Sequence, residues 1–141
     1  MACWLKDCAN DPYLANDPRL RPAKQVVDSL AGKRYADIVV ASWLLLDLTL
    51  FIGRAEPTSK YGFEVNRSHL GVFCRFHLTG EFSISLPQNP GDQWGVHREK
   101  GRNVRYGRWE STDDPQKAIE IIDHALESQL KILNIPPVEE E

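Results

Sequence analysis

The sequence predicts an α+β fold, in which an antiparallel sheet of roughly three to five strands packs against N-terminal helices and a C-terminal amphipathic helix. Three observations predict it: early segments with helical spacing, alternating β-branched and aromatic residues at about 60–110, and strong helical periodicity near the end. The chain has 141 residues, with 42% hydrophobic and 26% charged side chains, as in one globular domain. We therefore expect a single domain at 1–134 and an acidic tail at 135–141.

The first half of the chain predicts helices separated by turns. Residues 2–9 favour a short helical turn, and Asn-Asp-Pro at 10–12 and 16–18 indicates turns or a helix cap. Pro22 suits the first position of a helix that Gly32 ends. Residues 35–52 lack Gly and Pro. A helix formed by them would be apolar on nearly every face, so we expect a buried helix to about residue 46. Alternation at 47–52 leaves a strand as the alternative there.

Residues 60–86 predict an antiparallel meander. Apolar residues alternate with polar ones in three runs, and 66–69 and 78–81 are turn candidates between them. A loop at 88–95 and a fourth strand at 103–110 follow. The apolar residues of the three runs are Phe63 and Val65, then Val72, Cys74 and Phe76, then Phe82, Ile84 and Leu86.

Residues 111–134 predict an amphipathic helix. Thr112 or Asp114 can cap it, and Pro115 suits its first turn. Its apolar side consists of Ala118, Ile121, Ile122, Ala125, Leu126, Leu130 and Leu133.

The net charge of -3 is distributed unevenly along the chain. Residues 1–110 carry a balance of +3 and residues 111–141 a balance of -6. This excludes a uniformly basic nucleic-acid binder, but it leaves room for a local basic patch. Three cysteines, an odd number, and a start without a basic and then apolar run favour a reducing, cytoplasmic compartment. We expect no membrane span, because Asp37 and Asp47 leave only residues 38–46 free of charge.

Residues 94–109 form a basic-aromatic segment. They place five cations and one acid, Glu99, between Trp94 and Trp109. Arg and Trp are typical of interface hot spots, while cations beside aromatic rings also suit single-stranded nucleic acid. The candidate binding residues are Trp94, His97, Arg98, Lys100, Arg102, Arg105, Tyr106 and Arg108.

The function predicted from this segment is a small intracellular, non-catalytic binding module that acts through a protein partner, of the inhibitor, immunity or adaptor type known from bacteria and phages. The alternative is a nucleic-acid-binding protein that uses the same residues. A plain edge hairpin is a third interpretation, because a strand at 103–109 would divide its charges between two faces and Trp109 would anchor it to the last helix.

Catalysis and metal binding have weaker support. A buried Asp37 or Asp47 would have a raised pKa, but a helix-start carboxylate and a boundary residue are the simpler interpretations. A metal-dependent nuclease or hydrolase using Asp47 and Glu64 would want Lys two residues after Glu64, where Asn66 stands. Cys3 and Cys8 lack zinc-site spacing, and Cys74 alternates with apolar residues like a core thiol. We expect no cofactor and no metal.

Overall fold

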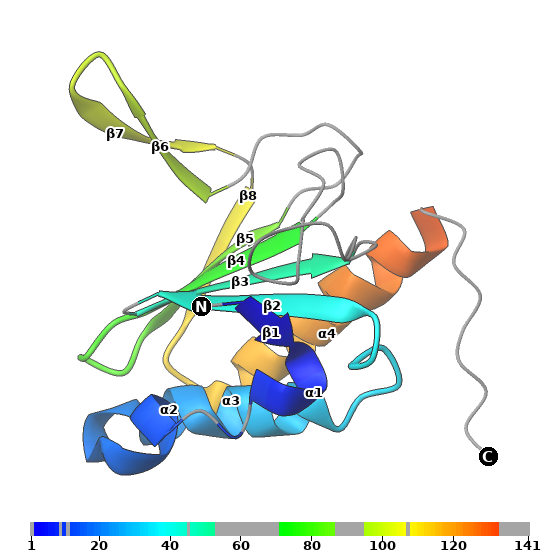
Figure 1. The fold of residues 1–141 in the computed structure, drawn as a ribbon. Coiled ribbons are helices and arrows are strands. Elements are labelled where there is room, and N and C mark those ends of the chain that lie inside the picture. The colour runs from blue at the N-terminus through cyan, green and yellow to red at the C-terminus, as the bar shows by residue number, and fades with distance from the viewer. Residues whose placement is uncertain are drawn as a thin grey trace.

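The computed structural model describes residues 2–8, 10, 12–44, 46–52, 71–86, 95–106 and 108–132. The predicted α+β fold class is confirmed: β2, β3, β4, β5 and β8 form an antiparallel sheet, and the short β1 extends it at the β2 edge. The helices lie together on one side of this sheet (Figure 1). The strands are β1 (Ala2–Trp4), β2 (Val39–Leu44), β3 (Asp47–Ile52), β4 (Gly71–Phe76), β5 (Phe82–Leu86) and β8 (Arg108–Thr112).

The short helical turn expected within residues 2–9 is present as α1 (Leu5–Cys8), and β1, which was not expected, precedes it. The second Asn-Asp-Pro caps the 3₁₀ helix η1 (Pro18–Leu20), where an Asp17 side-chain oxygen accepts a hydrogen bond from the Arg19 N–H at 3.0 Å. The remaining helices of this part are α2 (Pro12–Asn16) and α3 (Arg21–Ala31), and Gly32 ends α3 as predicted.

The helix expected at 35–46 is wrong. Short turns lead into β2, which pairs with β1 on one side and β3 on the other. Val39, Val40 and Ala41 are all buried, so both faces of this central strand are covered. A strand buried on both faces is apolar at every position, and it therefore lacks the alternation by which strands are recognised.

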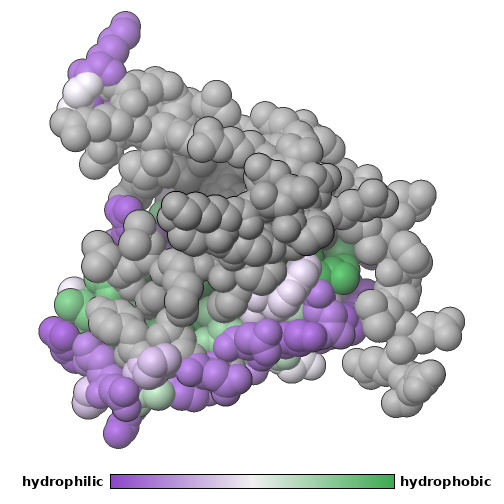
Figure 2. Space-filling view, in the orientation of Figure 1, coloured by the Kyte–Doolittle hydropathy of each residue, from purple (hydrophilic) through white to green (hydrophobic). Residues whose placement is uncertain are grey.

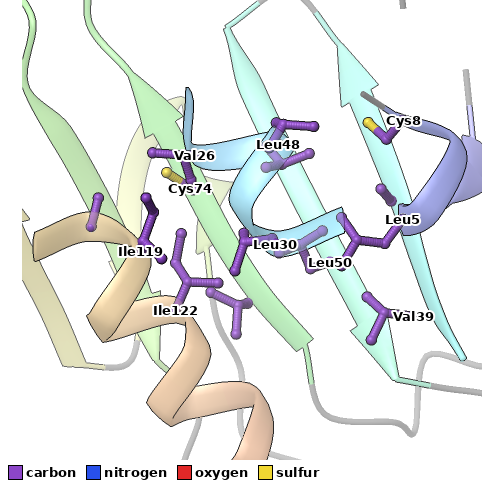
Figure 3. Packing of buried hydrophobic residues seen from close by; sticks show 14 of the residues in the cluster. Leu5, Cys8, Val26, Leu30, Val39, Leu48, Leu50, Cys74, Ile119 and Ile122 are labelled. Atoms are coloured by element: carbon purple, nitrogen blue, oxygen red, sulfur yellow. The ribbon is translucent and has the colours of Figure 1, made fainter. Parts of the chain in front are cut away.

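The hydrophobic core lies between the sheet and the long helices. Val26 and Leu30 of α3 and Ile122 of α4 (Pro115–Ile132) contact apolar side chains of the sheet (Figure 3). Leu50 and Cys74 are among the sheet residues that they cover. The predicted core thiol at Cys74 is confirmed, because its side chain is 4% exposed.

The part of the predicted meander that the structure describes, β4 and β5, is confirmed. β4 and β5 pair antiparallel, and the predicted turn at 78–81 joins them with Gly80 at a φ of 100°. A side chain would be strained at that φ. The first predicted strand, with Phe63 and Val65, and the turn at 66–69 lie outside the described residues.

The single fourth strand expected at 103–110 is two strands in different sheets. β7 (Arg102–Tyr106) pairs with β6 (Gly95–Glu99) in a two-stranded sheet of their own, whereas β8 pairs with β5. Lys100 and Gly101 connect β6 and β7 with φ angles of 49° and 76°. Two positive φ angles in a two-residue loop suit the twist of a hairpin. We call residues 95–106 the arm, and it extends from the body on the side away from the helices (Figure 1).

Candidate functional site

The arm carries most of the basic-aromatic segment. Its strands pair with each other, and within the described chain neither belongs to the main sheet. Lys100 and Arg102, at its turn, are exposed, and Figure 2 shows hydrophilic residues at this far end. Neither cation forms an ion pair with a side chain that the structure describes; the side chain of Glu99, opposite Arg102 in the strand register, is not among those described. His97, Arg98, Arg105 and Tyr106 belong to the arm backbone, but their side chains and the whole of Trp94 lie outside the described structure.

Arg108 does not belong to the arm. It lies on β8, and its guanidinium donates a hydrogen bond to Glu110 Oε1 at 2.9 Å. The structure therefore divides the basic-aromatic segment in two: an arm with exposed cations, and a strand of the main sheet whose arginine already has a carboxylate partner.

Trp109 faces away from α4, so the expected anchoring of this tryptophan on the last helix is wrong. Its ring packs edge-on against Phe73, with ring centroids 6.0 Å apart and an interplanar angle of 75°. The strand register places both rings and Ser85 in one row, on the sheet face opposite the core. Both rings are half-buried there.

The two acids considered for catalysis have structural partners. Asp37 is exposed and lies 3.3 Å from Lys6. Asp47 begins β3, and its two oxygens accept hydrogen bonds from Arg75 Nε and Nη2 at 2.8 and 3.2 Å. The bond to Asp47 raises the pKa of the Arg75 guanidinium. Glu64, the proposed companion of Asp47, lies outside the described residues.

Cys74 and His77 are also held by their surroundings. Burial raises the pKa of the Cys74 thiol to about 12, so the reactive thiolate is suppressed at neutral pH. His77 Nε2 lies 3.0 Å from Ser83 Oγ, and Ser83 is buried on β5. Cys3, considered above for a zinc site, has no described side chain.

A pocket of about 470 Å³ lies between β8 and α4, and sequence reasoning missed it. Its apolar lining comes from Leu86, Ile121 and Ala125, and Arg108 and Glu110 line it from β8. Thr112 and Asp114 fix how α4 begins beside β8. Thr112 Oγ1 accepts from the Asp114 N–H at 3.1 Å, and Asp114 Oδ1 accepts from the Gln116 N–H at 3.0 Å. Of the two predicted alternatives, Asp114 is therefore the helix cap, and the Thr112 bond closes the turn before it.

Gln129 is the most unusual residue that lines this pocket. Its side chain is 1% exposed, and Nε2 donates to the Gly71 carbonyl at 3.2 Å. Oε1 is buried and has no hydrogen-bond partner. A buried amide oxygen without a donor costs about 1–3 kcal/mol, so such a group needs an explanation.

The described part of the chain was compared with the requirements of a metal site and of a membrane span. That part has no cluster of three or more His, Cys, Asp or Glu side chains placed to hold a metal ion. None of its helices has the length and apolar character needed to cross a membrane. No protein-family model, curated protein or solved structure matches the chain.

Proposed function

We propose that the protein is a non-catalytic binding module that acts through a protein partner, and that the arm is its main contact with that partner. One observation carries the proposal: the arm forms a sheet of its own and presents exposed cations at its turn. An extension that pairs only with itself adds little to the core and much to the accessible surface. A contact surface is the role that such an extension fits best.

The charge of the arm indicates the chemistry of the partner. Lys100 and Arg102 are exposed cations, and Glu99 is the one acid among the five cations between Trp94 and Trp109, so the excess positive charge would be met by an acidic surface on the partner. Complementary charges increase association rates and select among partners more than they add affinity. We therefore expect partner binding that depends on salt concentration.

The experiment is a pull-down from a lysate of the native host, followed by measurement with the purified partner. The variant Lys100→Glu/Arg102→Glu should weaken the complex by roughly tenfold or more, mostly through slower association. Arg21→Glu/Lys131→Glu makes the same change in net charge at exposed positions on α3 and α4, and it serves as the matched control. Equal affinity of both double variants would remove the arm from the interface.

Single-stranded nucleic acid is the second candidate, and the row of Phe73 and Trp109 on the sheet favours it. Half-buried rings on a sheet face are an arrangement on which unpaired bases stack, and the Arg75 guanidinium lies 5.8 Å from the centre of the Phe73 ring. Nuclease treatment of one half of the lysate separates the candidates, because a protein complex survives it. Anisotropy with labelled 20-nucleotide poly(dT) and poly(U) tests the second one directly. Affinity that falls steeply between about 50 and 200 mM salt would support nucleic-acid binding.

A further inference from the structure

We infer that the pocket between β8 and α4 binds an extended peptide, which adds as a strand to the edge of β8 and places a neutral hydrogen-bond donor against Gln129 Oε1. This site is separate from the arm, and it does not depend on the function proposed above. Two independent observations carry it: the position of β8 in the sheet and the unpaired oxygen of Gln129.

β8 is the last strand of the main sheet in the order β1-β2-β3-β4-β5-β8. It pairs with β5, and no other described strand pairs with it. An edge strand presents backbone N–H and C=O groups that an added strand can satisfy. Because Arg108 and Glu110 of this same strand line the pocket, a peptide on the edge would pass directly beside the pocket.

The Gln129 amide is oriented without ambiguity. The Gly71 carbonyl can only accept a hydrogen bond, so the amide nitrogen must face it and Oε1 must face elsewhere. Oε1 has no partner, and Gln129 lines the pocket. Oε1 has less than 1 Å² of exposed surface, so the Gln129 side chain must shift toward the pocket for a ligand N–H or O–H group to satisfy this acceptor. A purely apolar ligand would leave it unpaired.

The rim of the pocket favours a neutral donor over a charged one. Arg108 is paired with Glu110 at 2.9 Å, and Lys117 lies 3.9 Å from Glu120 on the next part of the rim. Each of these four charges therefore has an opposite charge nearby, and His124 is exposed at the same rim. An unpaired ion inside the pocket would lose its hydration without gaining a counter-charge. Amide and hydroxyl side chains, those of Asn, Gln, Ser and Thr, are the expected occupants.

The volume suits one such side chain together with its flanking backbone. About 470 Å³ lies in the range of sites that bury most of a small ligand. Leu86, Ile121 and Ala125 would cover the aliphatic part of the side chain. Strand addition supplies affinity through main-chain bonds, and the pocket selects the residue type.

The test begins with panning of displayed random nonapeptides against the whole protein. The recovered sequence is then synthesised and titrated into the ¹⁵N-labelled protein. We expect an Asn, Gln, Ser or Thr in the consensus, and amide shifts confined to β8 and to the α4 positions that line the pocket. A failure to enrich any sequence, or shifts that map to the arm, would overturn the inference.

Two variants test the pocket itself. Ala125→Trp fills it and should abolish binding of the recovered peptide, while Ala15→Trp makes the same change at an exposed position of α2 and should not affect it. Gln129→Met keeps the approximate shape but removes the acceptor together with the bond to the Gly71 carbonyl, so it should weaken binding about tenfold, and urea denaturation measures the accompanying loss of stability. Far-ultraviolet circular dichroism identifies any variant that fails to fold. Unchanged affinity of a folded Ala125→Trp variant would show that the peptide binds elsewhere.

Peptide chemistry tests the strand addition separately. An added strand bonds through only one of its two edges, so N-methylation at one set of alternate positions should abolish binding and at the other set should be tolerated. If both N-methylated peptides bind like the parent peptide, strand addition is wrong. The arm variant Lys100→Glu/Arg102→Glu should bind the peptide normally, whether or not the arm contacts a protein partner.

Discussion

At the scale of single residues, hydrogen bonds and burial fix the polar groups that join the helices to the rest of the body. Tyr35, which is 1% exposed, donates its O–H to Asp123 Oδ1 of α4 at 2.7 Å. Arg34, next to it, donates from Nε to Glu127 Oε1 at 2.8 Å, one turn further along α4. The Arg34 guanidinium lowers the pKa of the Glu127 carboxyl. Neighbouring residues thus hold α4 in place at two successive turns.

Tyr35→Phe tests the first of these contacts. The ring stays buried, but Asp123 loses a donor, so we expect the free energy of unfolding to fall by about 1–2 kcal/mol. Urea denaturation at pH 7 measures this. Adding Tyr35→Phe to Asp123→Ala gives the control: if the bond matters, the second substitution costs less in the presence of the first. Fully additive costs would show that the hydroxyl contributes nothing through Asp123.

The thiol of Cys74 predicts how stability responds to alkaline pH. Burial raises its pKa from 9.0 to about 12, so in this range the unfolded chain loses a proton that the folded chain keeps. A raised folded-state pKa contributes stability below pH 9, and this stability is lost as the pH rises toward about 12. The loss is at most about 1.4 kcal/mol per pH unit for one group.

The measurement is the free energy of unfolding at a series of values between pH 8 and pH 10. Cys74→Ala should lower stability at every pH through lost packing, but it should also flatten the decline above pH 9. The pH stays at or below 10, because burial and the bond to Asp123 raise the Tyr35 pKa above its usual value of 10.0 and would add a second loss. If the free energy of unfolding falls equally steeply with pH in the parent protein and in Cys74→Ala, the Cys74 thiol is not the cause of the decline.

At the scale of elements, sequence reasoning succeeded where an element carries its own boundary signals. α3 has Pro22 near its start and Gly32 after its end, and α4 has Asp114 and Pro115 at its start. These signals act locally, through backbone geometry and caps, so they can be read without the rest of the fold. β2 has no such signal, because its burial on both faces comes from neighbours that are distant in sequence.

The cap of α4 offers a clean test at this scale. Asp114→Ala removes the acceptor for the Gln116 N–H and should cost about 1 kcal/mol of stability. Asp113→Ala removes the same charge at an exposed neighbouring position for which no cap bond is seen, and it serves as the control. Thermal unfolding of the two variants beside the parent protein measures the difference. If Asp113→Ala destabilises as much, the effect is one of charge near the helix end and not of capping.

At the scale of the whole molecule, the two candidate sites differ in how far sequence could reveal them. The arm comes from one continuous segment, so its cations were visible as a cluster. The pocket joins Leu86, Arg108 and a side of α4, which only the assembled sheet brings together. A partial signal existed: Ile121 and Ala125 are spaced four apart on one flank of the helix and widen its apolar stripe beyond the core, and Gln129 continues the same row.

The arm also predicts how the whole chain tolerates deletion. Gly95 and Tyr106 are paired partners at its base, so their Cα atoms are about 5 Å apart and a short glycine linker can replace the segment between them. The core residues whose burial the structure describes lie outside the arm, and only Lys100, Gly101 and Arg102 of the arm have a described burial, all three exposed. We expect the shortened protein to keep its melting temperature within about 4 °C, a change of less than about 1 kcal/mol. A loss of cooperative melting would show that the body needs the arm to fold.

The self-contained pairing of β6 with β7 has a consequence for how such a protein diversifies. For an arm with the role proposed above, substitutions are filtered by recognition of the partner and carry little penalty from misfolding. Related proteins are therefore expected to differ in partner through substitutions in the arm, while the sheet and its helices stay the same.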